Sequence, residues 1–328
     1  MSKIKAAITG IEAWVPEYVL TNHELSTMVD TNDAWIVERT GIRERHILKG
    51  EGLATSDLAV PAVKKLLEKT NTKPEEVEVI VFGTVTPDSP VPSTANILAD
   101  KLGIKNGFGF DVNAACCGFL YALTIGARLI ESGAHKKVIV VGADKMSSIV
   151  DYTDRNTCIL FGDGAGAVML EPSTEFGIED SVLYSDGEGR NFLGLKAGGS
   201  LYPASHETVE QRQHYLHQSG SIVFKSAVKG MSGAIEEILK RNNLAPEDIA
   251  WVVPHQANIR ILQSVAEYAN IPMDKVMINI QKYGNTTAAT IPLCLWEWQD
   301  QLKKGDKLLL TAFGGGFTWG CTYLTWAI

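Results

Sequence analysis

The sequence predicts an α/β protein built from two similar halves, and two observations support this. First, short apolar runs rich in β-branched residues recur along the 328 residues, and amphipathic stretches of helical length separate them. Second, residues 73–81 (KPEEVEVIV) and 245–253 (APEDIAWVV) repeat one pattern, in which a Pro-Glu-acid turn leads into an apolar run. We therefore expect a duplicated α/β unit, with one copy in each half.

The apolar runs are long enough for strands that are buried on both faces. Strands are predicted at residues 79–85, 138–143, 251–253 and 307–313. Helices are predicted at residues 56–70, 94–102, 118–132, 224–242 and 259–270. Residues 187–220 are rich in Gly, Ser and polar residues, which predicts a long excursion loop. The boundary between the halves is placed near Pro172, which gives units of residues 1–171 and 172–328.

Composition limits the class of protein. The formal net charge of −8 argues against nucleic acid and anionic membranes as partners. No secretory signal and no apolar run of membrane-spanning length is present. The five cysteines form no Cys-x-x-Cys pair, so we expect free thiols and a cytoplasmic protein.

The most informative segment is residues 111–119 (DVNAACCGF), which joins a strand-like stretch to a predicted helix. A thiol at a helix N-terminus lies at the positive end of the helix dipole, which favours the thiolate. Cys116 is therefore a candidate nucleophile for acyl transfer. The alternative is that Cys116 and Cys117 are a buried structural pair, because free cysteine is among the most buried residue types.

Two polar turns could support such a nucleophile. His255 follows the predicted strand at 251–253, at the sheet edge where α/β proteins bind ligands. Asn285 lies in the turn at residues 283–287 (YGNTT). A histidine alone is more often structural, and an asparagine in a turn usually caps the next helix. Together with Cys116, however, they could form a nucleophile with two supporting polar groups.

Glycine-rich segments suggest close backbone approach. Gly314, Gly315 and Gly316 follow the last predicted strand, where a backbone N–H could face a developing oxyanion. Residues 161–167 (FGDGAGA) match no phosphate-loop pattern, so we interpret them as close packing. His214 and His217 have no accompanying cysteine or acidic cluster, so no metal site is predicted.

Taken together, these motifs resemble the β-ketoacyl-[acyl carrier protein] synthase III family, the initiating condensing enzymes of bacterial type II fatty-acid synthesis. The match runs nearly from end to end. Besides the Cys116 segment it includes residues 35–47 (WIVERTGIRERHI), 86–89 (TPDS), 154–155 (DR), 161–167, 253–258 (VPHQAN), 283–286 (YGNT) and 312–320 (AFGGGFTWG). The resemblance implies a homodimer with a thiolase-like fold, in which two duplicated α/β halves form a five-layered αβαβα core.

The resemblance also implies the chemistry. Cys116 would take an acyl group from acyl-CoA, and decarboxylative condensation with malonyl-acyl carrier protein would then give β-ketoacyl-acyl carrier protein, CO2 and free CoA. His255 and Asn285 would stabilise the charge that develops on the malonyl thioester oxygen. The N–H of Gly315 would serve a second oxyanion hole with that of Cys116, and Phe313 would form an apolar wall that favours loss of CO2. No permanently bound cofactor is implied, since acyl-CoA is a substrate.

The remaining matches concern binding. Trp35 and Arg155 match the pair that sandwiches the CoA adenine, and Arg39, Asn258 and Arg260 match further CoA contacts. Lys225 and Arg260 match the docking patch for the acidic carrier protein. The sequence departs from the family here, because Glu267 and Tyr268 lie where the family has further basic residues.

Three alternatives stay open. The chain could be a thiolase-fold acyltransferase, or a condensing enzyme of secondary metabolism, that uses a different acceptor. A papain-type hydrolase also has Cys, His and Asn in this order, but its Cys-Gly-Ser/Ala-Cys-Trp/Tyr signature is absent. A catalytically silent binding subunit would be expected to lack the cysteine or the histidine, and both are present.

Overall fold

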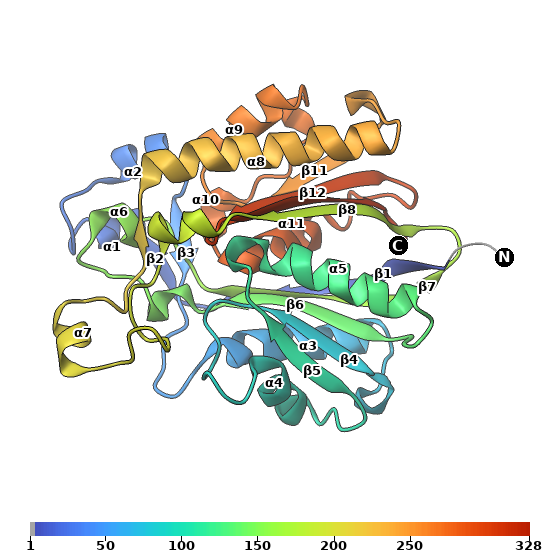
Figure 1. The fold of residues 1–328 in the computed structure, drawn as a ribbon, viewed down its shortest axis with the longest axis horizontal. Coiled ribbons are helices and arrows are strands. Elements are labelled where there is room, and N and C mark those ends of the chain that lie inside the picture. Colours follow the sequence, from blue (N-terminus) through green and yellow to red (C-terminus); the bar gives the residue numbers. More distant parts are fainter. Residues whose placement is uncertain (1–3) are drawn as a thin grey trace.

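The computed structural model describes residues 4–328, and these form five layers of alternating helices and sheets (Figure 1). The first sheet has the strand order β1-β7-β6-β4-β5, and the second has the order β11-β12-β13-β8. The first sheet contains β1 (Lys5–Trp14), β7 (Gly164–Ser173), β6 (Val138–Asp144), β4 (Val79–Gly83) and β5 (Phe108–Val112). The second contains β11 (Trp251–Pro254), β12 (Lys307–Gly314), β13 (Thr318–Thr325) and β8 (Gly177–Ser185). The expected αβαβα architecture is confirmed.

Helices cover the outer face of each sheet and fill the space between the two sheets (Figure 1). The outer layers are α3 (Thr55–Lys69) with α4 (Thr94–Leu102), and α8 (Gly220–Arg241) with α9 (Ile259–Tyr268). The central layer is α5 (Gly118–Glu131) with α11 (Thr290–Trp298). The shorter elements are β2 (Val19–Thr21), α1 (Asn22–Leu25), α2 (Asp33–Thr40), β3 (Glu44–His46), α6 (Arg155–Cys158), β9 (Leu193–Gly194), α7 (His206–Glu210), β10 (His217–Gln218) and α10 (Ile280–Tyr283).

The composition of α5 explains its central place. Its apolar side chains are buried against both sheets, and they include Phe119, Leu120, Leu123 and Ile130. A helix that is apolar on more than one face is stable only when it is buried on more than one face. The N-terminal end of α5 is thereby fixed between the halves, and it begins at Gly118, two residues after Cys116.

The repeated sequence pattern has a repeated structure. Pro74–Glu76 and Pro246–Asp248 both form 3₁₀ turns, after α3 and α8 respectively. In each turn the acidic third residue accepts a hydrogen bond from the backbone N–H that precedes the proline: Lys73 N to Glu76 Oε2, and Ala245 N to Asp248 Oδ2, both 2.8 Å. Each turn then leads to a strand, β4 or β11.

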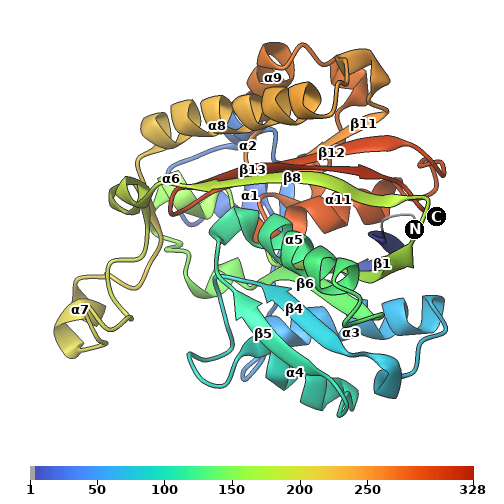
Figure 2. The ribbon, with the colours of Figure 1, turned by 45° about the vertical axis from the view of Figure 1, so that its right-hand side comes forward.

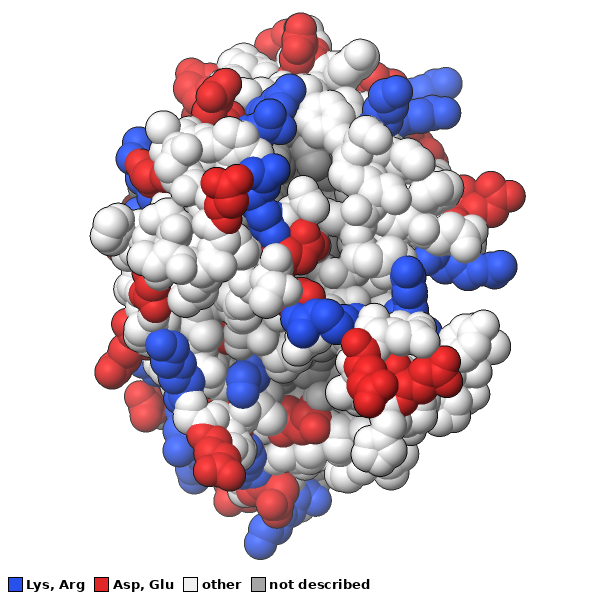
Figure 3. Space-filling model, turned by 90° about the vertical axis from the view of Figure 1, so that its left-hand side faces the viewer, with Lys and Arg blue, Asp and Glu red and all other residues white. Residues whose placement is uncertain are grey.

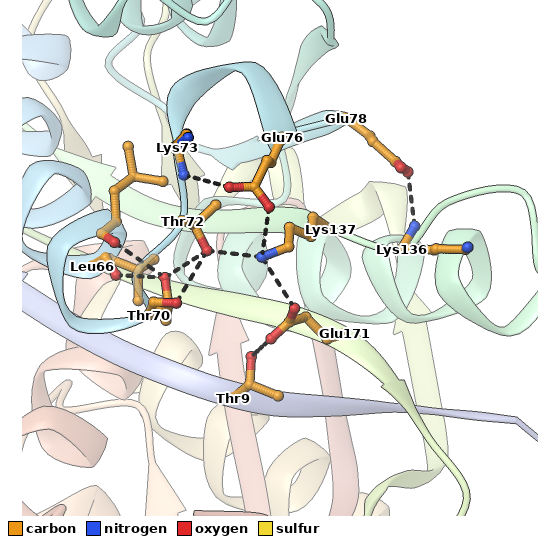
Figure 4. Close-up of polar contacts among 11 residues, drawn as sticks. Thr9, Leu66, Thr70, Thr72, Lys73, Glu76, Glu78, Lys136, Lys137 and Glu171 are labelled. Atoms are coloured by element: carbon orange, nitrogen blue, oxygen red, sulfur yellow. Dashed lines mark hydrogen bonds and ion pairs between the residues drawn. The ribbon is translucent and has the colours of Figure 1, made fainter.

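A polar network holds the end of the first sheet that lies away from Cys116 (Figure 4). The ammonium group of Lys137, which immediately precedes β6, lies 3.4 Å from Glu171 and 3.6 Å from Glu76, and it donates to Thr72. Glu171 in turn accepts a hydrogen bond from Thr9 on β1. These contacts join β1, β7 and the 3₁₀ turn that precedes β4.

Several boundaries differ from the predicted ones. The strand predicted at 79–85 ends at Gly83, because the next residues turn towards Asp144, whose carboxylate accepts the N–H of Val85 at 2.8 Å. β11 ends at Pro254, one residue beyond the predicted 253, and Val252 also makes an isolated bridge to Val276 outside the named strands. The loop predicted at 187–220 contains no long helix or strand before α8 begins at Gly220, but it includes the β9–β10 pair and α7, which projects from the body of the molecule (Figure 2).

No helix within residues 4–328 combines the length and the apolar character that a membrane span requires. The five cysteines, all within this part of the chain, are free thiols.

Candidate active site

A cavity of about 490 Å³ is lined by residues of both halves of the chain. Six of the predicted site residues line it: Cys116, His255, Asn258, Asn285, Phe313 and Gly315. The other five do not line this cavity: Trp35, Arg39, Arg155, Lys225 and Arg260. The structure thus brings the predicted nucleophile together with the histidine and asparagine.

Cys116 lies in the 3₁₀ turn Ala115–Cys117, between β5 and α5. The preceding Ala115 has φ +48°, a left-handed conformation that costs a residue with a side chain about 1–2 kcal/mol. The β12–β13 hairpin passes close by, since a Cβ on Gly314 would lie 2.6 Å from the backbone nitrogen of Cys116. Glycine at that position therefore lets the Gly315 segment reach the cysteine.

The electrostatic environment of Cys116 differs from the sequence-based expectation. Burial, with the nearby thiol of Cys117 and carboxylate of Asp144, raises the pKa of the Cys116 thiol well above its usual value. Desolvation of the thiolate therefore acts against the favourable end of the α5 dipole. The resting group is a thiol, and its reaction as a nucleophile requires a base.

Cys117 has a different environment from its neighbour. Its side chain is fully buried, its Sγ donates to the carbonyl oxygen of Thr318 at 3.3 Å, and burial raises its pKa to about 12. Cys117 is not among the residues that line the cavity. Of the two adjacent thiols, only that of Cys116 faces the space where a substrate could bind.

His255 directly follows β11, and its backbone N–H donates to the carbonyl of Thr311 on β12 at 2.8 Å. Its Nδ1 lies 2.7 Å from the hydroxyl oxygen of Thr290, the first residue of α11. Burial lowers the pKa of His255 to about 3, so the free imidazole is neutral at physiological pH.

The side chain of Asn285 is oriented by its own turn. Its Oδ1 accepts a hydrogen bond from the backbone N–H of Thr287 at 2.9 Å, and its backbone N–H donates to the carbonyl of Leu160 at 2.8 Å. Asn285 does not cap the next helix, because Thr286 and Ala289 occupy the N-cap positions of the 3₁₀ turn and of α11; its side-chain oxygen instead closes a turn on the N–H two residues later. Because that oxygen is used, the amide NH2 is the part of Asn285 left to serve as a donor to the cavity.

The two central helices approach the cavity in the same way. Each follows a 3₁₀ turn, Ala115–Cys117 before α5 and Thr287–Ala289 before α11. The first residue of each turn has a positive φ, +48° for Ala115 and +54° for Thr287. The duplication therefore places Cys116 in one turn and Asn285 beside the equivalent turn of the other half.

Asp144 is a site residue that sequence reasoning missed. It is fully buried at the end of β6, and it accepts hydrogen bonds from the Thr84 hydroxyl, the Val85 N–H and the Ala288 N–H at 2.8–3.1 Å. Burial raises its pKa to about 6. It joins the loop after β4 to the turn that follows Asn285. An acidic residue directly after an apolar strand was the available signal.

The excursion loop also contributes to the cavity, which its composition did not predict. Arg190, Leu193, Leu195, Leu216 and Gln218 all line it. The signal available was the presence of four leucines, three of which line the cavity, in a segment rich in Gly and polar residues. Their apolar side chains supply part of the wall on the side of β9 and β10.

The predicted adenine site is closed in this conformation. The guanidinium carbon of Arg155 lies 5.1 Å from the centre of the Trp35 ring, and that of Arg39 lies 4.7 Å from it. Arg155 also donates to the carbonyl of Asp30 at 3.0 Å. The guanidinium of Arg155 contacts the indole directly, so an adenine could stack on Trp35 at that face only after Arg155 moves.

Asn258 and Arg260 lie at the start of α9. Asn258 Oδ1 caps the helix by accepting the N–H of Arg260, and its Nδ2 donates to the carbonyl of Arg39 at 2.9 Å. Both ends of the Asn258 amide are therefore engaged within the protein. Arg260 is exposed, and its guanidinium lies 6.0 Å from the ring of Phe224, which lines the cavity.

Lys225 follows Phe224 on α8 and is also exposed. The predicted docking residues thus lie beside a cavity residue, on neighbouring helices. Tyr268, at the other end of α9, is 68 % exposed. Figure 3 shows the face that carries α2, α6 and α7, where a hollow is bordered by Lys and Arg side chains with acidic residues between them.

Comparisons with known proteins agree on one family. The family model described as 3-oxoacyl-[acyl-carrier-protein] synthase III matches residues 110–187, and the model of its C-terminal part matches residues 239–326. The chain is 56% identical over 327 residues to beta-ketoacyl-[acyl-carrier-protein] synthase III 2 of Bacteroides thetaiotaomicron, covering 99% of this chain and 98% of that protein. It is 51% identical over 328 residues to the synthase III of Porphyromonas gingivalis W83, covering 100% and 98%.

A solved structure has the same fold over the same length. The 3-oxoacyl-[acyl-carrier-protein] synthase III of Aquifex aeolicus VF5 superposes with a TM-score of 0.90 at 41% identity. The match covers 98% of this chain and 100% of that one.

Proposed function

This chain belongs to the 3-oxoacyl-[acyl-carrier-protein] synthase III family, and we propose that it catalyses the initiating condensation of type II fatty-acid synthesis. In this reaction an acyl group passes from acyl-CoA to an enzyme thiol and then to the carbanion formed from malonyl-acyl carrier protein. The observation that carries the proposal is the single cavity that Cys116, His255 and Asn285 share, although they come from three distant segments.

In the first half-reaction the sulfur of Cys116 attacks the thioester carbonyl of acyl-CoA. A new C–S bond forms to Cys116, the C–S bond to CoA breaks, and CoA leaves as a thiol. His255 is the proposed base, since the raised pKa of Cys116 keeps its proton in place until a base removes it. The N–H groups of Cys116 and Gly315 are proposed to bind the oxyanion of the tetrahedral intermediate.

In the second half-reaction malonyl-acyl carrier protein loses CO2, and the electrons of the broken C–C bond form an enolate. The amide NH2 of Asn285 and the ring of His255 are proposed to stabilise its oxygen. The enolate carbon then attacks the acyl group on Cys116, which releases the cysteine as a thiolate. Phe313 is 5 % exposed, and it packs against Phe317 with 4.9 Å between ring centres. This apolar wall would disfavour the malonyl carboxylate relative to CO2.

Acyl-CoA and malonyl-acyl carrier protein are thus the proposed substrates. Trp35, Arg39 and Arg155 would bind the nucleotide of CoA once Arg155 moves, and Asn258 would face the pantetheine arm. Lys225 and Arg260 would dock the carrier protein. The chemistry uses no permanently bound cofactor, and the free thiols fit a reducing cytoplasm.

We also propose that the protein is a homodimer that pairs through β5. This strand forms an edge of the first sheet, and its Phe108 is 50 % exposed and stacks on Phe110. An exposed apolar edge strand is a ready surface for pairing with a second copy. The two units proposed at residues 1–171 and 172–328 would then lie in each protomer.

A malonyl-dependent CO2-release assay tests the function. The protein should release CO2 from malonyl-acyl carrier protein only when an acyl-CoA is supplied, and β-ketoacyl-acyl carrier protein should form in equal amount. Acyl transfer to water or to another acceptor, without CO2 release, would instead favour the acyltransferase alternative.

A further inference from the structure

The imidazole of His255 has a buried partner to which the reaction described above gives no role. Its Nδ1 lies 2.7 Å from Thr290 Oγ1, and His255 and Thr290 are only 1 % and 2 % exposed. Thr290 is the first residue of α11, and its hydroxyl also lies 3.0 Å from the carbonyl oxygen of Thr287.

We propose that Thr290 is a positioning residue that keeps Nδ1 of His255 protonated and so reserves Nε2 for the proton exchanged with Cys116. The proposal rests on the function proposed above.

The hydroxyl of Thr290 carries one proton and has two neighbours. The carbonyl of Thr287 can only accept a hydrogen bond, and donation from Thr290 to this carbonyl three residues earlier is a common arrangement for threonine in a helix. With its proton so used, Thr290 Oγ1 can only accept from the second neighbour, the Nδ1 of His255. The ring proton must therefore be on Nδ1.

Protonation of Nδ1 determines what the other ring nitrogen, Nε2, presents to the cavity. His255 lines the cavity while its Nδ1 is held by Thr290, so Nε2 is the nitrogen available to a substrate. In the neutral imidazole one nitrogen donates and the other accepts. Nε2 therefore presents a lone pair, which is what removal of the Cys116 proton requires. Burial disfavours the doubly protonated ring, and so helps to keep Nε2 free in the resting enzyme.

The protons taken up and released are balanced over the two half-reactions. During acylation Nε2 takes the proton of Cys116 and gives it to the departing CoA sulfur. Condensation consumes one further proton, because the malonyl carboxylate leaves as neutral CO2 and Cys116 is released as a thiolate. A proton from solvent enters at Nε2 when the malonyl carboxylate binds, since a nearby negative charge favours the imidazolium. As an N–H donor Nε2 then stabilises the enolate oxygen, and it finally returns the proton to Cys116.

Two substitutions at position 290 distinguish the effect of the hydroxyl group from the effect of the side-chain volume. Thr290→Ser keeps the hydroxyl, and Thr290→Val keeps the volume without it. A matched control is Thr124→Val, since Thr124 lies on the other central helix and its hydroxyl bonds the Leu120 carbonyl in a similar way. Each variant is tested for its acylation rate by rapid-quench mass measurement across pH 6–9.

We expect Thr290→Val to acylate at least tenfold more slowly than wild type, with a changed pH profile, because general-base catalysis contributes about 10²–10⁴ in rate. Thr290→Ser should restore the wild-type rate and profile, and Thr124→Val should match wild type. Wild-type acylation by a folded Thr290→Val variant would overturn the proposal.

A second measurement needs no activity and no variant at position 290. In the ¹⁵N spectrum of histidine-labelled wild-type protein, the His255 signals, assigned by their loss in His255→Gln, should show protonated Nδ1 and unprotonated Nε2. The opposite tautomer would overturn the proposal even if the condensation itself were demonstrated. Failure of the proposed function would appear separately, as absence of malonyl-dependent CO2 release by the wild-type protein.

Discussion

The side-chain oxygen of Asn285 accepts a hydrogen bond from the backbone N–H of Thr287 at 2.9 Å, which fixes the orientation of the amide group. Thr287 adopts a left-handed conformation, with φ +54°, in the turn that makes this bond. The turn is held in place in part by Asp144, which accepts the N–H of the next residue, Ala288. The local backbone thus determines which end of Asn285 can donate to a substrate.

This orientation predicts the effect of removing the donor. Asn285→Ala should acylate from acyl-CoA at close to the wild-type rate, because the first half-reaction does not use its amide. Malonyl decarboxylation should fall by about 100-fold, since loss of one oxyanion donor typically costs 10²–10³ in rate. The two steps are measured separately, by intact mass and by CO2 release. If neither step slowed, the role assigned to Asn285 would be wrong.

Trp35 provides a test of CoA recognition. Trp35→Ala should raise the KM for acyl-CoA about fivefold, since a stacking or cation–π contact contributes about 1 kcal/mol. Turnover with an acyl-pantetheine thioester, which lacks the nucleotide, is the internal control and should be unchanged. An equal loss with both thioesters would contradict adenine stacking on Trp35.

The environment of His255 predicts a pH dependence of stability. Its pKa is about 3 in the folded protein and about 6.5 in the unfolded chain, so the unfolded state binds more protons between these values. The free energy of unfolding should therefore fall as pH drops below 6.5, by up to about 1.4 kcal/mol per pH unit from this group.

Urea unfolding at pH 5.0 and 6.5 would measure the contribution of His255 to the pH dependence of the free energy of unfolding. The His255→Gln variant should lose less stability between these pH values than wild type. His23→Gln is the matched control, because His23 is exposed on α1, and it should behave as wild type. Equal pH dependence for His255→Gln and wild type would show that His255 does not titrate as its burial predicts.

The exposed edge of β5 predicts the effect of a charge on assembly. Phe108→Lys should shift the protein from dimer to monomer in sedimentation experiments, because the lysine would be buried without a partner. Val209 on α7 is 62 % exposed and provides the control, since Val209→Lys adds the same charge away from the proposed interface. A dimer that is unaffected by Phe108→Lys would place the interface elsewhere.

The sequence predicted the α/β layering, and the repeated Pro-Glu-acid turns were a true structural repeat. It missed strands such as β1 and β13, because Thr and Gly residues interrupt their sequences (KAAITGIEAW and TWGCTYLT), so neither forms the continuous apolar run that identified the other strands. Cys116 and His255 could be found because each follows the end of a strand, Cys116 beside a second cysteine and His255 beside Gln256 in a polar turn. Their shared cavity could not be read from the sequence.

The supporting residues were harder to predict than the reacting ones. Thr290 is one threonine among many, and only the packing of α11 against β11 places its hydroxyl on His255. The raised pKa of Cys116 was also missed, because the helix dipole is visible in sequence while desolvation depends on the assembled walls of the cavity.

The role of Cys116 as the nucleophile is best examined by the intact mass of the protein after brief exposure to an equimolar mixture of acyl-CoAs, followed by peptide mapping. We expect one acyl adduct on Cys116, which is lost in Cys116→Ser and retained in Cys117→Ser, because Cys117 faces Thr318 in the core. The mass of the adduct would also identify the preferred primer. An adduct on Cys117, or no adduct on the folded protein, would show that Cys116 is not the acyl-accepting nucleophile.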